Sequence, residues 1–283
     1  MDRLAKGGPM DEPVGMPAGI DPGIPSVARM YDYYLGGKDN FPSDRAAAEE
    51  IIAIARRMGN DARQVARENR DFLGRAVRHL AESGVRQFVD IGAGLPTQEN
   101  VHQVAQRYAP GARVVYVDND PVVLVHARAI LAGDPGTIVV SGDLRDPYSI
   151  FDDPMVRDHI DFAQPFAVLL VAVLHFIPED EVASGVVARI RERLSPGSHL
   201  VLSHIYQGDG DEAVTRAGRR LYSTTTSGGI ASRNLPQIAS YFEGMSLLEP
   251  GIVPVQAWRP ETPWDVPVDL ERPGILGVVG RMD

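Results

Sequence analysis

Residues 87–98 read QFVDIGAGLPTQ, and they predict the type of fold. The stretch opens with the apolar residues of a strand and breaks at Gly92, Ala93 and Gly94. Glycine has no Cβ, so such a turn can be sharp and can let a ligand approach the backbone closely. Apolar residues at positions 101, 104, 105 and 108 then give a helical pattern. The order strand, glycine turn, helix is typical of nucleotide-binding α/β proteins.

The glycine turn departs from the dinucleotide fingerprint G-x-G-x-x-G, whose third glycine allows a helix to pack closely on a strand. Thr97 stands at that third position, and an acid, Asp90, stands two residues before the first glycine. The pattern acid-x-Gly-x-Gly resembles the first motif of the S-adenosylmethionine (SAM)-dependent methyltransferases of the Rossmann-like class. In that class the turn lies against the methionine part of SAM, so the resemblance implies cofactor contacts at Asp90 and at residues 92–94.

The composition argues against several classes of function. Lys and Arg number 28 against 38 Asp and Glu, a net charge of −10, whereas nucleic-acid binding needs a basic face. Cysteine is absent, which excludes disulfides and cysteine nucleophiles, and the seven histidines show no metal-ligand spacing. The sequence has no apolar run that could span a membrane and no secretory signal. We therefore expect a cytoplasmic protein with no metal, no nucleic-acid partner and no membrane association.

Strands and helices alternate between residues 87 and 203, which predicts βαβ units and a parallel sheet. After the first strand, further strands are predicted at residues 113–117, 137–140, 166–174, 199–203, 246–258 and 275–281. Residues 147–161 are predicted to be a polar connector. The methyltransferase resemblance implies that the last two strands form an antiparallel hairpin. The expected fold class is α/β, a Rossmann-like methyltransferase fold with a seven-stranded, mostly parallel sheet and an N-terminal helical extension.

Three segments are expected along the chain. Residues 1–25 are rich in Gly, Pro and Met without a period, which is typical of a disordered or loosely ordered tail. Residues 26–60 predict a helical arm or lid. Residues 61–283 predict the SAM-binding methyltransferase domain.

Acids end the second and third predicted strands, at the edge where an open parallel sheet binds its ligands. The two carboxylate oxygens of Asp118 can accept both hydroxyls of a ribose. Asp143 can accept from the adenine amino group. Each acid taken alone could be an ordinary capping or turn residue, although Asp120 suits the capping role better than Asp118. Besides the glycine turn, the predicted nucleoside site comprises Asp90, Asp118, Asn119, Asp143 and Leu144.

Four stretches give a closer resemblance: PSVARMYDYYLGGKDNF at 25–41, QFVDIGAGLPT at 87–97, VVYVDNDPVV at 114–123 and EPGIVPVQAWRP at 249–260. They are similar to an actinobacterial family of SAM-dependent methyltransferase-like proteins. The resemblance implies SAM as cofactor and does not imply a methyl acceptor, for which we expect a small molecule. Two alternatives remain: a SAM-binding protein without catalysis, and an NAD(P)-dependent oxidoreductase, which the missing third glycine and Asp143 disfavour.

Candidate acceptor residues follow the later strands. His175 follows the fourth strand and is the candidate base if the acceptor must lose a proton. His204 follows the fifth strand and is a candidate substrate contact, whereas His199 begins that strand and is expected to be structural. Trp264 lies in the Pro-rich loop 259–273 and gives it an aromatic surface for an apolar acceptor. A histidine or tryptophan in such positions can also be purely structural.

The segment 26–41 lies outside any Rossmann sheet, yet it concentrates Arg29, Tyr34 and Lys38 around a pair of glycines. We expect it to fold over SAM, with Arg29 or Lys38 meeting the methionine carboxylate and Tyr34 excluding water. The alternative is a helix that only packs on the core through its apolar side chains.

Overall fold

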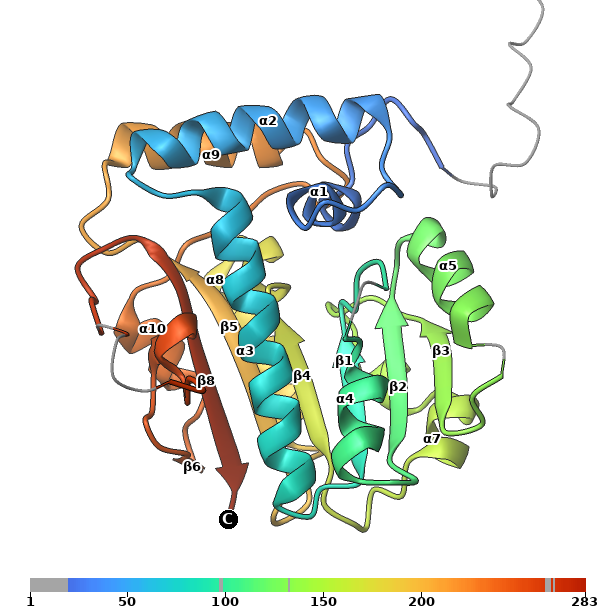
Figure 1. The fold of residues 1–283 in the computed structure, drawn as a ribbon. Coiled ribbons are helices and arrows are strands. Elements are labelled where there is room, and N and C mark those ends of the chain that lie inside the picture. The colour runs from blue at the N-terminus through green and yellow to red at the C-terminus, as the bar shows by residue number, and fades with distance from the viewer. Residues whose placement is uncertain (1–19, 97–98, 132, 263–265, 267) are drawn as a thin grey trace, which may run out of the picture.

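A single sheet forms the centre of the molecule (Figure 1). The computed structural model describes residues 20–283 apart from 97–98, 132, 263–265 and 267, so most of the predicted tail lies outside the described residues. The sheet has eight strands in the order β3-β2-β1-β4-β5-β8-β6, and β7 also pairs with β8. The strands are β1 (Gln87–Ile91), β2 (Arg113–Asp118), β3 (Thr137–Ser141), β4 (Ala167–Val171), β5 (His199–Tyr206), β6 (Met245–Leu247), β7 (Val253–Pro254) and β8 (Gly274–Met282).

Strand directions confirm the predicted Rossmann-like methyltransferase class. Strands β1 to β5 are parallel, and β8 runs antiparallel to β5, β6 and β7. Every residue of β1 is buried, as expected for a parallel strand that is covered on both faces. The chain order reverses between β1 and β4, and open α/β sheets bind their ligands outside the strand ends at such a switch point.

Helices cover both faces of the sheet and bury two apolar cores. On one face lie α3 (Ala62–Glu82), α4 (Val101–Tyr108) and α5 (Pro121–Leu131), together with the 3₁₀ turn η2 (Val255–Ala257). On the other lie α6 (Pro147–Phe151), α7 (Pro154–His159), α8 (Asp180–Arg191) and α10 (Leu235–Ser240). The 21-residue α3 presents an apolar stripe to the sheet through Phe72, Val77 and Leu80, all fully buried.

Three further helices form a cap over the carboxyl ends of the strands. They are α1 (Val27–Tyr34), α2 (Pro42–Arg57) and α9 (Glu212–Tyr222), of which α2 and α9 lie side by side across the top of Figure 1. A third apolar cluster, which includes Met30 from α1, Ile52 from α2 and Val214 from α9, holds the cap together. The predicted arm therefore packs against a helix from the other end of the chain.

The segment predicted as a polar connector, residues 147–161, contains α6 and α7 instead. Each helix begins with an aspartate cap followed by proline, Asp146 with Pro147 and Asp153 with Pro154, and each cap accepts backbone N–H hydrogen bonds. Proline suits the first helical position because its missing N–H is not needed there. The two Asp-Pro pairs could have predicted these helix starts from the sequence. The polar composition of the segment led instead to the prediction of a connector.

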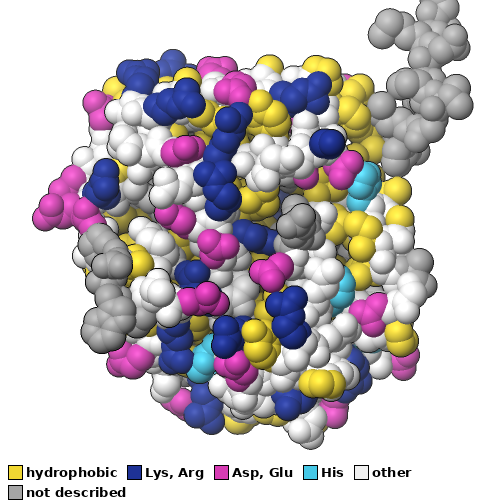
Figure 2. Space-filling model, viewed as in Figure 1, with side chains coloured by type: hydrophobic (Ala, Val, Ile, Leu, Met, Phe, Trp, Pro, Cys, Tyr) yellow, Lys and Arg dark blue, Asp and Glu magenta, His cyan; other side chains and the backbone are white. Residues whose placement is uncertain are grey.

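The strand predicted over residues 246–258 is divided into β6, β7 and η2. Pro250 has no backbone N–H for a ladder, and Gly251 has φ +84, so the extended conformation breaks there. Because this predicted strand is divided, the sheet has eight strands instead of the expected seven. Among the helices in the described ranges, none is long and apolar enough to cross a membrane. On the face shown in Figure 2, Lys and Arg side chains are interspersed with Asp and Glu.

Candidate active site

A cavity of about 360 Å³ lies between the carboxyl ends of the parallel strands and the cap. Its wall includes ten of the residues singled out from the sequence: Tyr34, Asp90, Gly92, Ala93, Gly94, Asp118, Asn119, Asp143, Leu144 and His175. The topology brings these residues together from positions 34 to 175, because strands β1, β2, β3 and β4 all end at this edge.

The glycine turn requires glycine for steric reasons. Gly92 has φ +76, and a Cβ there would lie 2.3 Å from Cγ2 of Val173, closer than real Cβ contacts come. Its N–H donates to the carbonyl of Val117 at 2.8 Å, which holds the turn against β2. Gly94 has φ +65 and lies on the cavity wall. The turn is thus a fixed backbone cradle with no side chains at the two glycines.

Asp90 lies at the base of this cradle with its carboxylate unused. The residue is 4% exposed, and no hydrogen bond joins its carboxylate to another residue in the described ranges. Burial raises the pKa of Asp90 to about 7; the nearby Arg70 guanidinium opposes the shift and the Asp118 carboxylate adds to it. A buried acid without a partner is costly for the free protein, so this position suits a cationic ligand group.

Arg70 lies on the cavity wall with the glycine turn, and the sequence analysis did not anticipate it. It extends from α3 to the cavity wall, and its Nη2 donates to Oδ1 of Asn100 at 3.0 Å. Its Nε is buried, and no residue in the described ranges forms a hydrogen bond with it. The cradle therefore has a cationic group, the Arg70 guanidinium, next to an acidic one, the Asp90 carboxylate. The first suits an anionic group of a ligand and the second a cationic group.

Asp118 is organised by backbone donors. Its Oδ2 accepts from the N–H of Gly94 and its Oδ1 from the N–H of Asp120, both at 2.9 Å. Burial raises the pKa of Asp118, and these two N–H groups oppose the shift. Each carboxylate oxygen keeps a second lone pair, so the side chain can still accept two further hydrogen bonds. Asp143, by contrast, is half-exposed at the rim and pairs with Arg145, 3.4 Å away.

Two of the expected cofactor contacts lie elsewhere. Arg29 is buried behind the arm, where its Nε donates to Asp44 at 2.8 Å and its Nη1 to Asp120 at 3.4 Å. Lys38 is exposed, and neither residue is on the cavity wall. Arg29 fastens the arm to the core instead of facing a ligand, because a buried guanidinium must be paired and Asp44 and Asp120 pair it.

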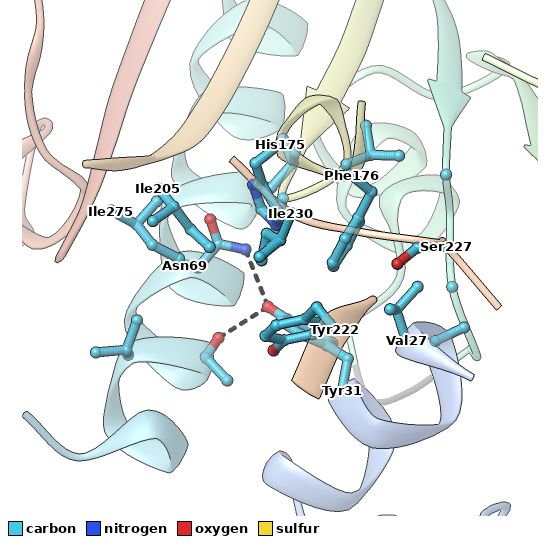
Figure 3. A pocket seen from close by; sticks show the side chains of 18 of the residues that line it. Val27, Tyr31, Asn69, His175, Phe176, Ile205, Tyr222, Ser227, Ile230 and Ile275 are labelled. Atoms are coloured by element: carbon cyan, nitrogen blue, oxygen red, sulfur yellow. Dashed lines mark hydrogen bonds between the residues drawn. The ribbon is translucent and has the colours of Figure 1, made fainter. Parts of the chain in front are cut away.

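Figure 3 shows the part of the cavity that we name the acceptor chamber, after the role proposed below. It is walled by Val27, Tyr31, Asn69, His175, Phe176, Ile205, Tyr222, Ser227, Ile230 and Ile275. The hydroxyl of Tyr31 donates to the Ala66 carbonyl at 3.0 Å and accepts from the Asn69 amide at 2.9 Å (Figure 3). Ser203 completes this chain by donating to Asn69 at 2.6 Å. These polar groups satisfy one another and leave the chamber mainly aromatic and aliphatic.

His175 is the exception among the polar groups of the chamber. It lies in the 3₁₀ turn η1 (Leu174–Phe176), which follows β4. Its Nδ1 is buried and forms no hydrogen bond with any residue that the structure describes. Burial holds the pKa of His175 well below its usual value, and His204 and Arg233 lower it further. The imidazole is therefore neutral at physiological pH, and a lone pair on the ring can accept a hydrogen bond from a ligand.

His204 does not reach the cavity wall, contrary to expectation. Arg233 donates to its Nε2 at 2.8 Å, so Nδ1 carries the hydrogen and donates to the Ile205 carbonyl at 2.8 Å. Both nitrogens are occupied, and burial lowers the pKa of His204 to about 4. His199, expected to be structural, is buried at the opposite end of β5 and is not part of the cavity wall.

Trp264 lies outside the described residues, so its predicted place beside the acceptor stays a prediction. The end of the same loop does reach the cavity, where Pro273 forms part of the wall. The other tryptophan, Trp258, is fully buried against Phe72, with ring centroids 5.5 Å apart.

Sequence reasoning missed four residues of the site: Asn69 and Arg70 of α3, Phe176 of η1 and Tyr222 of the cap. One signal was present for Asn69, which interrupts the apolar stripe of α3 between Ala66 and Leu73 at helical spacing. A polar residue at a core-facing helical position needs a partner or a function. The other three positions show no such pattern.

The fold and the site define an α/β protein with a nucleoside-type cradle at its switch point. The sequence model of the family described as S-adenosyl methyltransferase matches residues 14–283, and the chain belongs to this family. A crystal structure of a candidate methyltransferase from Thermobifida fusca YX is similar, with 40% identity, a TM-score of 0.86 and coverage of 96% of this chain and 100% of that one. A DUF574 family protein from Streptomyces avermitilis MA-4680 is similar too, with 39% identity, a TM-score of 0.82 and coverage of 92% and 98%. A search of the curated proteins gave no match.

Proposed function

We propose that this protein binds SAM across the glycine turn and transfers its methyl group to a small molecule. One observation carries the proposal: a glycine turn flanked by two buried acids, Asp90 and Asp118, opens into an acceptor chamber within the same cavity. Membership of the S-adenosyl methyltransferase family supports the choice of cofactor.

The donor set of the cavity fits each part of SAM. Asp118 has two lone pairs free for the ribose hydroxyls, and Asp90 can pair with the ammonium group. The free Nε of Arg70 can donate to the carboxylate, a role that the sequence had suggested for Arg29 or Lys38. Asp143 and Leu144, which follow β3, lie where the adenine would rest. The ammonium and the carboxylate of the ligand thus each meet a group of opposite charge on the cavity wall.

Bound SAM would supply an electrophilic methyl group. The residues of the chain would orient the reactants, exclude water and accept a proton. The apolar chamber and the cap exclude water from the transfer. The walls orient the acceptor for in-line attack, which is where most of the rate enhancement of such a reaction arises. His175 is placed to accept a proton at a ring nitrogen. The cytoplasmic location and the absence of nucleic-acid and membrane partners remain predictions.

Calorimetric titration of the full chain with SAM, S-adenosylhomocysteine and NAD tests the cofactor. We expect binding of the first two and none of NAD. Binding of NAD alone would favour the oxidoreductase alternative. Binding of SAM with no transfer of a labelled methyl group to any member of a broad acceptor panel would favour the non-catalytic alternative.

A further inference from the structure

The acceptor chamber contains no ionised side chain among its ten named residues. The charged residues elsewhere on the cavity wall have other partners or lie outside the chamber. Asp90 and Asp118 flank the glycine turn, Arg70 donates to Asn100, and Asp120 accepts from Ser26. Arg145 pairs with Asp143, and the exposed Arg219 donates to Ser232. A charged acceptor entering the chamber would therefore lose its hydration without gaining a counter-charge.

Aromatic rings line one side of the chamber in a continuous row. The ring centroid of Phe176 lies 4.4 Å from that of His175 and 5.8 Å from that of Tyr222. Ile205, Ile230 and Ile275 supply aliphatic surface, and Figure 3 shows all six residues around one space. Such walls favour a flat apolar molecule that can rest against several rings at once.

Among the described residues of the chamber, His175 has the buried polar atom that lacks a hydrogen-bond partner. Its buried Nδ1 has no partner, whereas Tyr31, Asn69 and Ser203 form a closed hydrogen-bond chain. Buried polar groups in native proteins are nearly always satisfied, and the His175 ring lies on the cavity wall without a hydrogen bond to any described residue, so a ligand group can complete it. A hydroxyl can do so without bringing a charge into the chamber.

We infer that the methyl acceptor is an uncharged, flat, apolar molecule whose hydroxyl group is held by His175, as in a phenol. This inference rests on the proposed function and names its substrate class. An amine that is protonated in water, or a carboxylate, fits the chamber poorly because neither would find a counter-ion there.

Charge is conserved in the resulting step. The hydroxyl oxygen attacks the methyl carbon as the carbon–sulfur bond breaks, and the electron pair of that bond stays on sulfur. The hydroxyl proton moves to a ring nitrogen of His175, so the products are a neutral methyl ether, S-adenosylhomocysteine and an imidazolium. One positive charge is present in the cavity before and after the transfer. Loss of the sulfonium charge removes a repulsion that would disfavour the imidazolium, which helps His175 to accept the proton.

Three probes that share one ring system and differ in charge test the inference: 2-naphthol, 2-naphthoate and 2-naphthylmethylammonium. Each is titrated calorimetrically at neutral pH into the full chain saturated with S-adenosylhomocysteine. We expect 2-naphthol to bind at least tenfold more tightly than either ion. We also expect His175→Leu to weaken its binding at least fivefold while S-adenosylhomocysteine binding stays unchanged.

His199→Leu is the matched control, since His199 is also a buried histidine with an unpartnered Nδ1 but is not part of the cavity wall. It should leave 2-naphthol affinity within twofold of the wild type. Equal or tighter binding of either ion, binding of none of the probes at millimolar concentration, or equal effects of the two substitutions would overturn the inference. If His175→Leu does not fold, the ranking of the three probes on the wild-type chain decides. Failure to bind S-adenosylhomocysteine would instead refute the proposed cofactor.

Discussion

Ser26 donates its hydroxyl hydrogen to Oδ2 of Asp120 at 2.5 Å, across 94 positions of the sequence. The other oxygen of Asp120 accepts from the N–H of Val122 at 2.8 Å and so caps α5. One carboxylate thus starts a helix of the core and fastens the N-terminal arm. It does so two residues from Asp118, so docking of the arm and organisation of the proposed ribose site share one loop.

The substitution Ser26→Ala should weaken SAM binding about three- to tenfold. The removed hydrogen bond to a carboxylate is worth roughly 1.5–3 kcal/mol. Only part of this free energy should be lost from SAM binding, because the rest is lost when the arm detaches more readily from the core. Calorimetry on the full chain measures the effect. Ser43→Ala is the control, because the Ser43 hydroxyl donates to the Pro22 carbonyl at 2.6 Å and does not touch Asp120. Equal dissociation constants for the two variants would mean that the arm does not cover the cofactor.

Asp118→Ala should weaken SAM binding by about 1.5–3 kcal/mol, the scale for hydrogen bonds to a charged group. The fold should persist because Asp120 still caps α5. Since Asp118 also holds the N–H of Gly94, Asp118→Asn separates the two effects by keeping one acceptor oxygen. An unchanged dissociation constant in Asp118→Ala would place the ribose elsewhere.

Asp90 should make cofactor affinity depend on pH. Its folded pKa of about 7 lies above the unfolded value, so the free fold gains stability as the pH falls from about 7 towards 4. Only the ionised form can pair with the ammonium group, so SAM affinity should rise as the pH rises through 7. Titrations between pH 5.5 and 8.5 check this, and a flat profile would argue against the pairing. Arg70 and Asp118 are the charged groups that act on Asp90.

Asp90→Asn should separate stability from binding. Removing a buried carboxylate that has no partner should raise the free energy of unfolding of the free protein at pH 8, by at most about 4 kcal/mol for a pKa displaced by roughly three units. SAM affinity should fall and lose its dependence on pH. Thermal unfolding with and without SAM measures both effects. A variant that is less stable than the wild type without ligand would show that Asp90 supports the fold.

Gly92→Ala should destabilise the protein by about 1–3 kcal/mol from backbone strain alone, with a further cost from the contact with Val173. Val173→Ala in the same chain should recover only the contact part. Gly74 in α3 is the matched control, because a Cβ there meets nothing within 4 Å and alanine should stabilise the helix by about 0.5–1 kcal/mol. Chemical denaturation compares the variants, and equal stability of Gly92→Ala and the wild type would contradict the steric argument.

The cofactor half of the cavity was predictable because local rules determine it. A glycine turn after a strand has one common use, and acids that follow parallel strands gather at one edge of the sheet whatever the loops do. That is why Asp90, Asp118 and Asp143 were placed together correctly on the cavity wall. Their ligand roles stay predictions.

The acceptor half was less predictable because it depends on which way side chains point. Side chains alternate along a strand, so Ser203 and Ile205 face α3 while His204 faces the opposite core, where Arg233 binds it. Arg29 was misjudged for a similar reason, since nothing local indicates that Asp44 and Asp120 would enclose it. Tertiary pairing of charges leaves no periodic trace in a sequence.

The cap helices and the glycine-turn cradle are separate parts of the chain, so their sequences can vary separately among members of this family. Helices α1, α2 and α9 come from opposite ends of the chain and supply much of the cavity roof, whereas the cradle for the cofactor belongs to the sheet. Substitutions in the cap that leave the Ser26 and Arg29 contacts to Asp120 in place can therefore alter the shape of the chamber without touching Gly92, Asp90 or Asp118. Selection can then act on the choice of acceptor separately from the choice of methyl donor, so members with the same cradle can diverge in what they modify.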